Sequence, residues 1–231
     1  MRKVNDFIVF MDDVLGEGQY GKVCKAQLAS DLLQNVNKDG SKQQAVRSTV
    51  DPTKKIYACK IIEIADISQE DLACIHKEVR IHGMVRSPHS VRLHQTIKTG
   101  SNIYMMQEYA NGFDLAVLLK AKGTIRQEEA RIIISQVVAG IRDVWALQII
   151  HRDMKLANIL LHFPDKPEME SMNKMQKKQF LYSVDLTRVE FQVKISDFGL
   201  STILDGTNTN LSICGTPLYS SPQLLKKRGY S

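Results

Sequence analysis

The sequence predicts an α+β fold in two lobes, in which a strand-rich lobe precedes a helical one. The first observation is a set of five apolar segments of strand length, at residues 7–15, 20–27, 56–62, 91–97 and 102–109. The second is a helical apolar spacing that dominates the chain after residue 110. A length of 231 residues with 43% hydrophobic residues is enough for a sizeable core. We therefore expect a first lobe over 1–109 and a second over 110–231.

Composition and charge exclude several classes of protein. The net charge of +6 allows an anionic partner, but no run of basic residues reaches the length typical of a nucleic-acid-binding tail, so we expect no nucleic acid. The apolar stretch 7–11 is too short for a signal peptide or a membrane span. Cys24, Cys59, Cys74 and Cys214 lack the spacing of a zinc site. Reduced cysteines and a cytoplasmic location are expected.

Two polar stretches interrupt the pattern, one in each predicted lobe. Residues 30–55 lack the apolar spacing of a core segment and are expected to form a mobile insertion between the second and third strands. Residues 163–190 contain two prolines and several lysines and are more typical of a solvated loop than of a docking site.

Three segments have the pattern of helices. Residues 69–85 are amphipathic with acidic residues near the start, and residues 113–122 form a short helix. Thr124, with Gln127 three positions later, fits a capping box that opens a long helix extending to about Leu147. Its apolar stripe requires at least one buried face and consists of Ile133, Val137, Ile141 and Val144.

A glycine-rich segment, Gly16 to Val23, matches GxGxxGxV between two predicted strands. Glycines at these positions let backbone N–H groups approach phosphate oxygens without obstruction by side chains. A simple hairpin turn would also explain Gly16, Gly18 and Gly21. A dinucleotide-binding fold is a third interpretation, but it requires a helix directly after the glycines, and this sequence continues as a strand.

Lys60 and Glu78 form a candidate pair that follows the glycine-rich segment. Lys60 lies on the third strand, where an ammonium group could neutralise charge on the α- and β-phosphates. Glu78 lies on the following helix and could supply the carboxylate that holds this ammonium group in place. Neither residue is informative by itself, because lysine and glutamate are common on protein surfaces.

The most specific motif is HRDMKLAN at residues 151–158. Asp153 can accept or orient the proton of an attacking hydroxyl, and Lys155 can contact the γ-phosphate. Asn158 offers an oxygen ligand to Mg²⁺. Asp197, followed by Phe198 and Gly199 at the end of a strand, is the candidate for the main metal ligand.

With these four motifs in this order, the sequence closely resembles the eukaryotic protein kinase family from Gly16 to about Gln223. The resemblance implies a bilobal kinase-like fold, ATP and Mg²⁺ as cofactors, and one regulatory helix in a five-stranded first lobe. It also implies a hinge at Glu108, Tyr109 and Ala110 whose backbone meets adenine. The further nucleotide contacts that it implies are Glu17, Val23, Ala58, Gln107 as gatekeeper, Asp114 at the ribose, and Leu160.

The resemblance also suggests the substrate class. Lys155 and the segment Gly215 to Pro217 resemble the serine/threonine branch, so the expected partners are proteins with Ser or Thr acceptors. The stretches 108–115 and 214–222 look most like the autophagy-initiating, Unc-like kinases. Arg152 beside Asp153 resembles the residue by which such kinases sense a phosphorylated activation loop. The candidate phosphorylation sites are Ser201, Thr202, Thr207, Thr209 and Ser212, and we expect Ser212 to be the main one.

The sequence departs from the family in three places. Ser221 to Gln223 stand where the family has Ala-Pro-Glu, and the helices expected after the activation segment do not follow within the sequence, so a partial helical lobe with exposed apolar side chains is expected. His82 occupies a position where relatives place an apolar residue. It could weaken the link to Phe198 or be a packed neutral histidine. A nucleotide- or partner-binding module with little activity is therefore the alternative to an enzyme.

Overall fold

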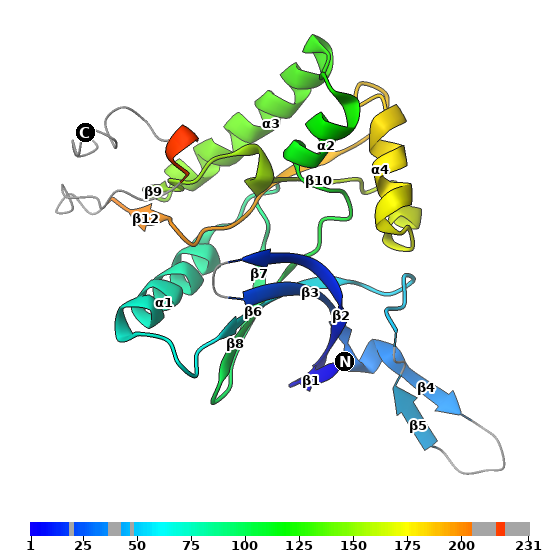
Figure 1. Ribbon diagram of the computed structural model, residues 1–231, viewed down its shortest axis with the longest axis vertical. Helices are drawn as coiled ribbons and strands as arrows, with labels where there is room; N and C mark the ends of the chain where they lie inside the picture. Colours follow the sequence, from blue (N-terminus) through cyan, green and yellow to red (C-terminus); the bar gives the residue numbers. More distant parts are fainter. Residues whose placement is uncertain (19–20, 37–42, 47–48, 205–215, 220–231) are drawn as a thin grey trace. The chain divides into compact units, whose positions relative to one another are not determined.

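The computed structural model describes residues 1–18, 21–36, 43–46, 49–204 and 216–219 (Figure 1). It shows an α+β fold, as predicted. The chain divides into two compact units, one made of Met1–Leu72 with Leu93–Tyr109 and the other of Ala73–Arg92 with the chain from Ala110 onward. The sequence placed 73–92 in the first lobe. The contacts assign it to the second unit because Ile81 and Val85 pack in a cluster with Phe198.

The first unit is built on a six-stranded antiparallel sheet (Figure 1). In spatial order its strands are β1 (Arg2–Val4), β2 (Phe7–Gly18), β3 (Gly21–Leu28), β6 (Tyr57–Glu63), β8 (Asn102–Glu108) and β7 (Leu93–Lys98). Buried side chains on one face, among them Val9, Cys24 and Cys59, form a continuous hydrophobic cluster. The five predicted strands are confirmed, and the sheet has one more.

The sixth strand is β1, which the sequence did not predict. Val4 pairs with Phe7, which leaves Asn5 and Asp6 as a two-residue turn. Asn5 has φ 48°, a left-handed conformation that asparagine tolerates and that tight hairpins favour. The hairpin buries Val4 in the same cluster as Val9.

The insertion in the first unit is partly structured. A 3₁₀ turn (η1, Ala29–Leu32) precedes β4 (Leu33–Val36), which pairs antiparallel with β5 (Gln43–Val46). Leu32 is only 1% exposed and packs with Ile8 and Phe10. The prediction that 30–55 lacks the apolar spacing of a core segment therefore does not hold at Leu32, which the many polar residues around it in the sequence hid.

The second unit contains most of α1 (Gln69–Met84), with α2 (Leu115–Lys122) and α3 (Gln127–Trp145). The capping box of α3 is formed by Arg126 and Glu129, because the Glu129 carboxylate accepts from the Arg126 backbone N–H. The predicted pair of Thr124 and Gln127 is wrong by two residues. An Asx- or Ser/Thr-based rule does not anticipate an arginine at the N-cap.

Helix α3 has one buried and one exposed apolar face. Ile133, Val137 and Val144 are buried, whereas Ile141, predicted in the same stripe, is 42% exposed. Ile141 belongs instead to a second stripe of exposed side chains that also includes Ile134, Val138 and Trp145. Of the four side chains in the predicted stripe, Ile141 alone is exposed.

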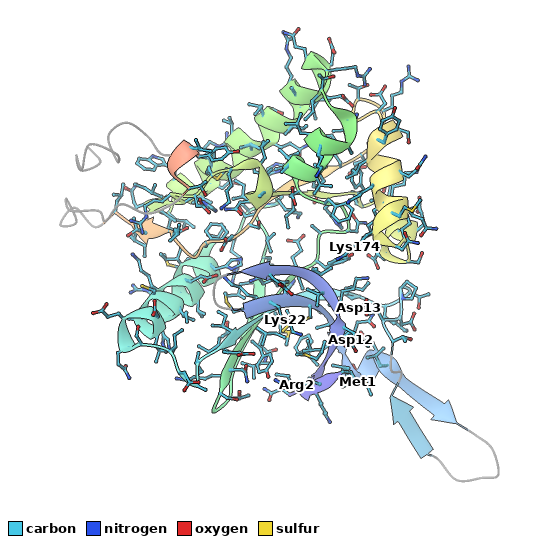
Figure 2. All side chains as sticks on the ribbon, viewed as in Figure 1. Met1, Arg2, Asp12, Asp13, Lys22 and Lys174 are labelled. Carbon is cyan, nitrogen blue, oxygen red and sulfur yellow. The ribbon has the colours of Figure 1, made fainter. Side chains whose placement is uncertain are left out.

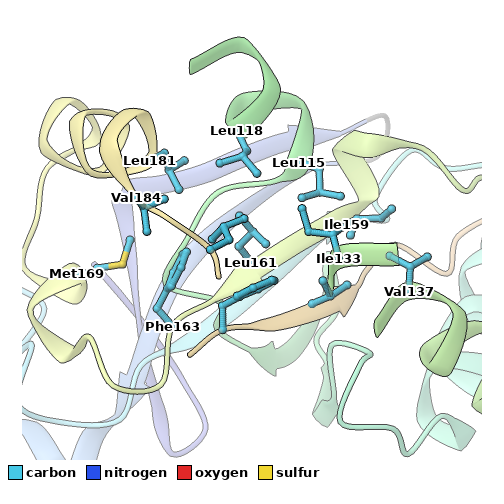
Figure 3. Close-up of a cluster of buried hydrophobic side chains, with 13 residues drawn as sticks. Leu115, Leu118, Ile133, Val137, Ile159, Leu161, Phe163, Met169, Leu181 and Val184 are labelled. Atoms are coloured by element: carbon cyan, nitrogen blue, oxygen red, sulfur yellow. The ribbon is translucent and has the colours of Figure 1, made fainter. Parts of the chain in front are cut away.

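The insertion in the second unit is folded, so the prediction of a solvated loop is wrong. It contains a 3₁₀ turn (η3, Pro167–Glu170) and helix α4 (Lys174–Ser183). Phe163, Met169 and Leu181 are fully buried with side chains of α2 and α3 (Figure 3). Lys174 and Lys178 are exposed on α4, whereas Lys177 is buried.

Four short strands and two 3₁₀ turns complete the described part of the second unit. They are β9 (Ile149–Ile150), η2 (Leu156–Asn158), β10 (Ile159–His162), β11 (Gln192–Ile195), β12 (Thr202–Ile203) and η4 (Pro217–Tyr219). Strand β10 pairs with β11, and β9 pairs with β12. In the described part of the chain, none of the helices has both the length and the apolar character needed to cross a bilayer.

Candidate active site

The glycine-rich segment lies in the first unit, at the hairpin between β2 and β3. Gly18 pairs with Gly21, and the two residues between them lie outside the described residues. Gly21 has φ 152°, and a Cβ there would lie 1.9 Å from the Ile61 carbonyl oxygen, so the fold itself requires glycine. A Cβ at Gly16 would meet nothing within 4 Å, and one at Gly18 nothing nearer than 3.9 Å. Packing therefore does not explain Gly16 and Gly18, whereas access for a ligand would.

Four predicted nucleotide-binding residues share one face of the sheet. Val23 pairs with Lys60, and Ala58 pairs with Gln107. Because side chains alternate along a strand and paired residues share a face, Val23, Ala58, Lys60 and Gln107 point to the same side. The structure thus brings together in the first unit residues that are far apart in sequence.

A cleft of about 630 Å³ opens on the other face of this sheet. Lys22 and Ile61, which line it, alternate with Val23 and Lys60. Arg2, also in the lining and labelled in Figure 2 with Lys22, donates to the Tyr104 hydroxyl at 2.9 Å. The cleft is therefore separate from the face that carries Lys60.

The HRDMKLAN motif forms a compact hydrogen-bonded loop in the second unit, between β9 and β10. The Lys155 ammonium lies 2.7 Å from Oδ2 of Asp153, a side chain that is only 6% exposed. The Asn158 amide donates to the Asp153 carbonyl at 2.8 Å and to Asp153 Oδ2 at 2.9 Å. Three of the predicted catalytic residues are thus in direct contact.

Thr216 completes this cluster, although sequence reasoning used it only as a marker of substrate class. Its hydroxyl donates to Oδ1 of Asp153 at 2.9 Å, and its backbone N–H donates to the same oxygen at 3.1 Å. Lys155 donates to the Thr216 hydroxyl at 3.1 Å. The signal for a direct role lay in the Gly-Thr-Pro segment, but its distance of more than fifty residues from Asp153 hid the contact.

These contacts set the charge of Asp153. Burial alone raises the pKa of the carboxyl, but hydrogen bonds from Lys155 and Thr216, with the charge of Lys155, outweigh it and lower the pKa below the ordinary value. Asp153 is therefore a carboxylate at neutral pH, and both of its oxygens are hydrogen-bond acceptors.

His151 holds the loop to the segment that contains Asp197. Its Nδ1 accepts from the Asp153 backbone N–H at 3.3 Å, which leaves Nε2 as the donor to the Ser196 carbonyl at 3.0 Å. Burial lowers the pKa of His151, so the ring is neutral at neutral pH. Arg152 has φ 66° and donates from Nε to the Leu200 carbonyl. Both contacts fix the loop against residues 196–200.

The carboxylates of Asp197 and Glu78 both lie close to Gly199. A Cβ at Gly199 would be 3.3 Å from Asp197 Oδ1 and 3.4 Å from Glu78 Oε2, so a side chain there would crowd both carboxylates. Asp197 has φ 63°, and the N–H of its neighbour Ser196 donates to the Asn158 carbonyl at 2.9 Å. Lys60 lies in the other unit, so its pairing with Glu78 remains a prediction.

The predicted metal ligands have the right chemistry for Mg²⁺. Asn158 uses its amide nitrogen on Asp153, which leaves its oxygen for a cation, and Asp197 supplies a carboxylate. Among the described residues, no three His, Cys, Asp or Glu side chains gather into a metal site. Mg²⁺ is commonly held by one or two protein oxygens together with phosphates, so this pair of ligands fits a metal that arrives with a nucleotide.

His82 packs directly on Phe198. The ring centroids are 5.0 Å apart, and Nε2 of His82 donates to the Val91 carbonyl at 2.7 Å. The His151 ring also contacts the Phe198 ring, with centroids 5.1 Å apart. Of the two interpretations of His82, a packed histidine fits these contacts.

The predicted ribose and adenine residues of the second unit lie on neighbouring segments. Asp114 is the N-cap of α2 and accepts from the Val117 N–H at 2.9 Å, and it forms a β-bridge with Leu160. Ala110 precedes this segment by four residues. Both Asp114 and Leu160 are half-buried.

The predicted phosphorylation sites are divided by the structure. Ser201 and Thr202 are 2% and 3% exposed, which makes them poor substrates in this conformation. The Lys77 ammonium donates to the Thr202 hydroxyl at 3.0 Å. Thr207, Thr209 and Ser212, like the Ser221–Gln223 triplet, lie outside the described residues.

A curled antiparallel sheet, a helical second unit and an HRDMKLAN loop followed by Asp-Phe-Gly define the fold and loop of a protein kinase domain. The family model described as "Protein kinase domain" matches residues 39–231. The chain belongs to the protein kinase domain family.

Three curated relatives of this chain are kinases by name. The chain is 30% identical over 178 residues to a "Serine/threonine-protein kinase SIK3 homolog" of Danio rerio, which covers 77% of this chain and 13% of the relative. It is 29% identical over 180 residues to "Probable serine/threonine-protein kinase MARK-A" of Dictyostelium discoideum, covering 78% and 14%. It is 27% identical over 219 residues to human "NUAK family SNF1-like kinase 2", covering 95% and 27%. The chain thus matches a small part of each relative's length.

Proposed function

We propose that this chain transfers the γ-phosphoryl group of ATP to Ser and Thr hydroxyls of proteins. The observation that carries the proposal is the Thr216 hydroxyl, which donates to Asp153 Oδ1 while Lys155 donates to that hydroxyl. An aliphatic hydroxyl, a carboxylate acceptor and an ammonium group are thus already within hydrogen-bonding distance. A substrate hydroxyl bound to the same carboxylate would have its proton oriented for transfer.

The roles of the other residues follow from their chemistry. MgATP, when bound, would supply the phosphoryl group and a divalent charge that stabilises the phosphate oxygens. Asn158 and Asp197 would hold the metal, and Lys60, fixed by Glu78, would contact the phosphates. The open backbone at Gly16 and Gly18 would lie against the same phosphates.

We also propose a finer assignment and a location. Residues 108–115 and 214–222 support a relationship to the Unc-like, autophagy-initiating kinases, while the relatives above carry other names. Scattered cysteines without disulfide or zinc spacing support a cytoplasmic location. Phosphorylation of Ser212 is the proposed switch.

Acceptor specificity tests the proposal. The protein is incubated with MgATP and three matched peptides that differ only in a Ser, Thr or Tyr acceptor, and phosphate incorporation is measured. Nucleotide binding is followed in parallel by the shift in melting temperature. We expect a nucleotide-dependent shift and incorporation into the Ser and Thr peptides. A shift without incorporation into any peptide would favour a nucleotide-binding module, and incorporation confined to the Tyr peptide would refute the substrate class.

A further inference from the structure

The insertion of the second unit contacts the segment that precedes α2. Lys177 lies on α4, and its side chain is 6% exposed. Its ammonium donates to the carbonyl oxygen of Asn111 at 2.7 Å. A buried ammonium group is costly unless it is hydrogen-bonded, so this contact fixes both the helix and the carbonyl it meets.

Asn111 is also held from the start of the insertion. Its side-chain oxygen accepts from the Phe163 N–H at 2.8 Å, and its amide donates to the Phe163 carbonyl at 2.9 Å. Asn111 is 2% exposed and Phe163 is fully buried. The insertion therefore holds Asn111 at two points: Lys177 binds its backbone carbonyl, and the backbone of Phe163 binds its side chain.

The residues after Asn111 are hydrogen-bonded to β10 and packed closely against it. The Gly112 N–H donates to the Leu161 carbonyl at 3.0 Å, and a Cβ at Gly112 would lie 2.5 Å from that oxygen. The Leu161 N–H donates in turn to the Phe113 carbonyl at 2.9 Å. Asp114 then forms its bridge with Leu160.

These contacts form a continuous path from Lys177 to Asp114 and Leu160, two of the residues proposed to meet the nucleotide. We infer that the insertion 163–190 positions the nucleotide-binding segment Asn111–Asp114, and that Lys177 is the positioning residue. This inference rests on the proposed function, because it concerns how the same enzyme binds ATP. Lys177 would act on the affinity for ATP and leave the hydroxyl-activating group Asp153 unaffected.

The packing around Lys177 explains why the insertion can act as a rigid support. Leu181, one turn along α4, is fully buried with Leu115 and Leu118 of α2 (Figure 3). Helix α4 is therefore attached both to α2, which begins directly after Asp114, and to Asn111, three residues before it. A displacement of α4 would move the segment between these two points.

The test compares Lys177→Met with Lys178→Met in the full chain. The first variant keeps the aliphatic stem and removes the donor, and the second makes the same change at an exposed neighbour on the same helix. We expect Lys177→Met to raise the KM for ATP about five- to tenfold, because the segment that ends at Asp114 loses one of the contacts that fix it, with kcat and the peptide KM within about twofold of wild type. Lys178→Met should match the wild type in all three constants.

The alternatives are distinguishable. An unchanged KM for ATP in a folded Lys177→Met protein, or an equal loss in kcat with KM unchanged, would overturn the inference. If Lys177→Met does not fold, as judged by circular dichroism, Asn111→Ala replaces it, because it removes the bonds to Phe163 and carries the same expected rise in KM for ATP. A wild-type protein without phosphotransfer would instead overturn the proposed function, and the effect of Lys177→Met on the dissociation constant of a fluorescent ADP analogue would then decide the inference.

Discussion

The two insertions of this chain are both polar in sequence, yet they fold differently. The insertion at 30–55 contributes Leu32 to a small cluster with Ile8 and Phe10 and otherwise forms a two-stranded pair. The insertion at 163–190 contributes a helix and several fully buried side chains to the largest cluster of the second unit. The difference shows that the spacing of a few apolar residues, and not overall polarity, decides whether an insertion becomes part of a core.

The ends of the two insertions are held by different chemistry. At the first, the buried Gln27 amide donates to the Asp51 carbonyl at 2.7 Å and accepts from the Asp51 N–H at 2.8 Å. At the second, the Glu129 carboxylate accepts from the Leu186 N–H at 3.0 Å and from the Lys122 ammonium at 2.6 Å. One end is therefore fixed by a neutral amide and the other by a buried ion pair.

The largest expected effect comes from loss of core packing. Leu181→Ala and Leu32→Ala compare this loss between the two insertions. Each substitution removes the same atoms from a site that is at most 1% exposed. We expect Leu181→Ala to lower the free energy of unfolding by about 3–5 kcal/mol and Leu32→Ala by about 2–3 kcal/mol. Leu181 lies in the larger cluster, so its truncation removes more packing contacts and leaves a larger cavity.

Urea unfolding followed by circular dichroism measures both values, and the fluorescence of Trp145, the single tryptophan, reports on the second unit. A loss below about 1 kcal/mol for Leu181→Ala would show that α4 is not part of the core. A larger loss for Leu32→Ala than for Leu181→Ala would reverse the comparison.

The ion pair at the second insertion should make stability depend on pH. Burial alone raises the pKa of Glu129, but hydrogen bonds from Lys122, the Leu186 N–H and Arg126 outweigh it and lower the pKa to about 2. A carboxyl whose pKa is lower in the folded state stabilises the fold above its unfolded value of about 4.3 and loses this contribution as the pH falls toward 2. Glu129→Gln should therefore cost roughly 2–3 kcal/mol at pH 7 and progressively less below about pH 4.

The matched control is Gln27→Leu, which removes the neutral amide at the first insertion. It should cost about 1–3 kcal/mol, because it leaves the Asp51 N–H and carbonyl without their amide partner in a buried site. This loss should be the same at pH 7 and at about pH 3, where much of the Glu129 contribution is lost. Chemical denaturation at the two pH values measures both variants, and a pH-independent loss for Glu129→Gln would contradict the assignment of the ion pair.

The sequence alone was sufficient to predict features in which the local backbone requires a particular residue type. Gly21 marks a position at which any Cβ would collide with a backbone oxygen, and the HRDMKLAN loop closes on itself within eight residues. The sheet could be predicted because 56–62 and 102–109 are apolar runs of strand length. These features depend on neighbours that are close in sequence.

Sequence was insufficient where the partner is distant or the local signal is weak. The contact of Thr216 with Asp153 joins residues far apart in the chain. Helix α4 has a capping box at Asn173 and Gln176, but its lysines and low apolar content hid it. Lys177 looks like any surface lysine in sequence, and only tertiary structure shows that it is buried.

Phosphotransfer by Asp153→Asn tests the central claim most directly. The substitution keeps the size of the side chain and removes the carboxylate that accepts from the Thr216 hydroxyl, and Asp165→Asn makes the same change at an exposed position in the second insertion. We expect Asp153→Asn to lower the rate of phosphate transfer to a Ser peptide about 100- to 10,000-fold, with nucleotide binding retained. Asp165→Asn should keep the wild-type rate. A transfer rate that survives Asp153→Asn would contradict the account.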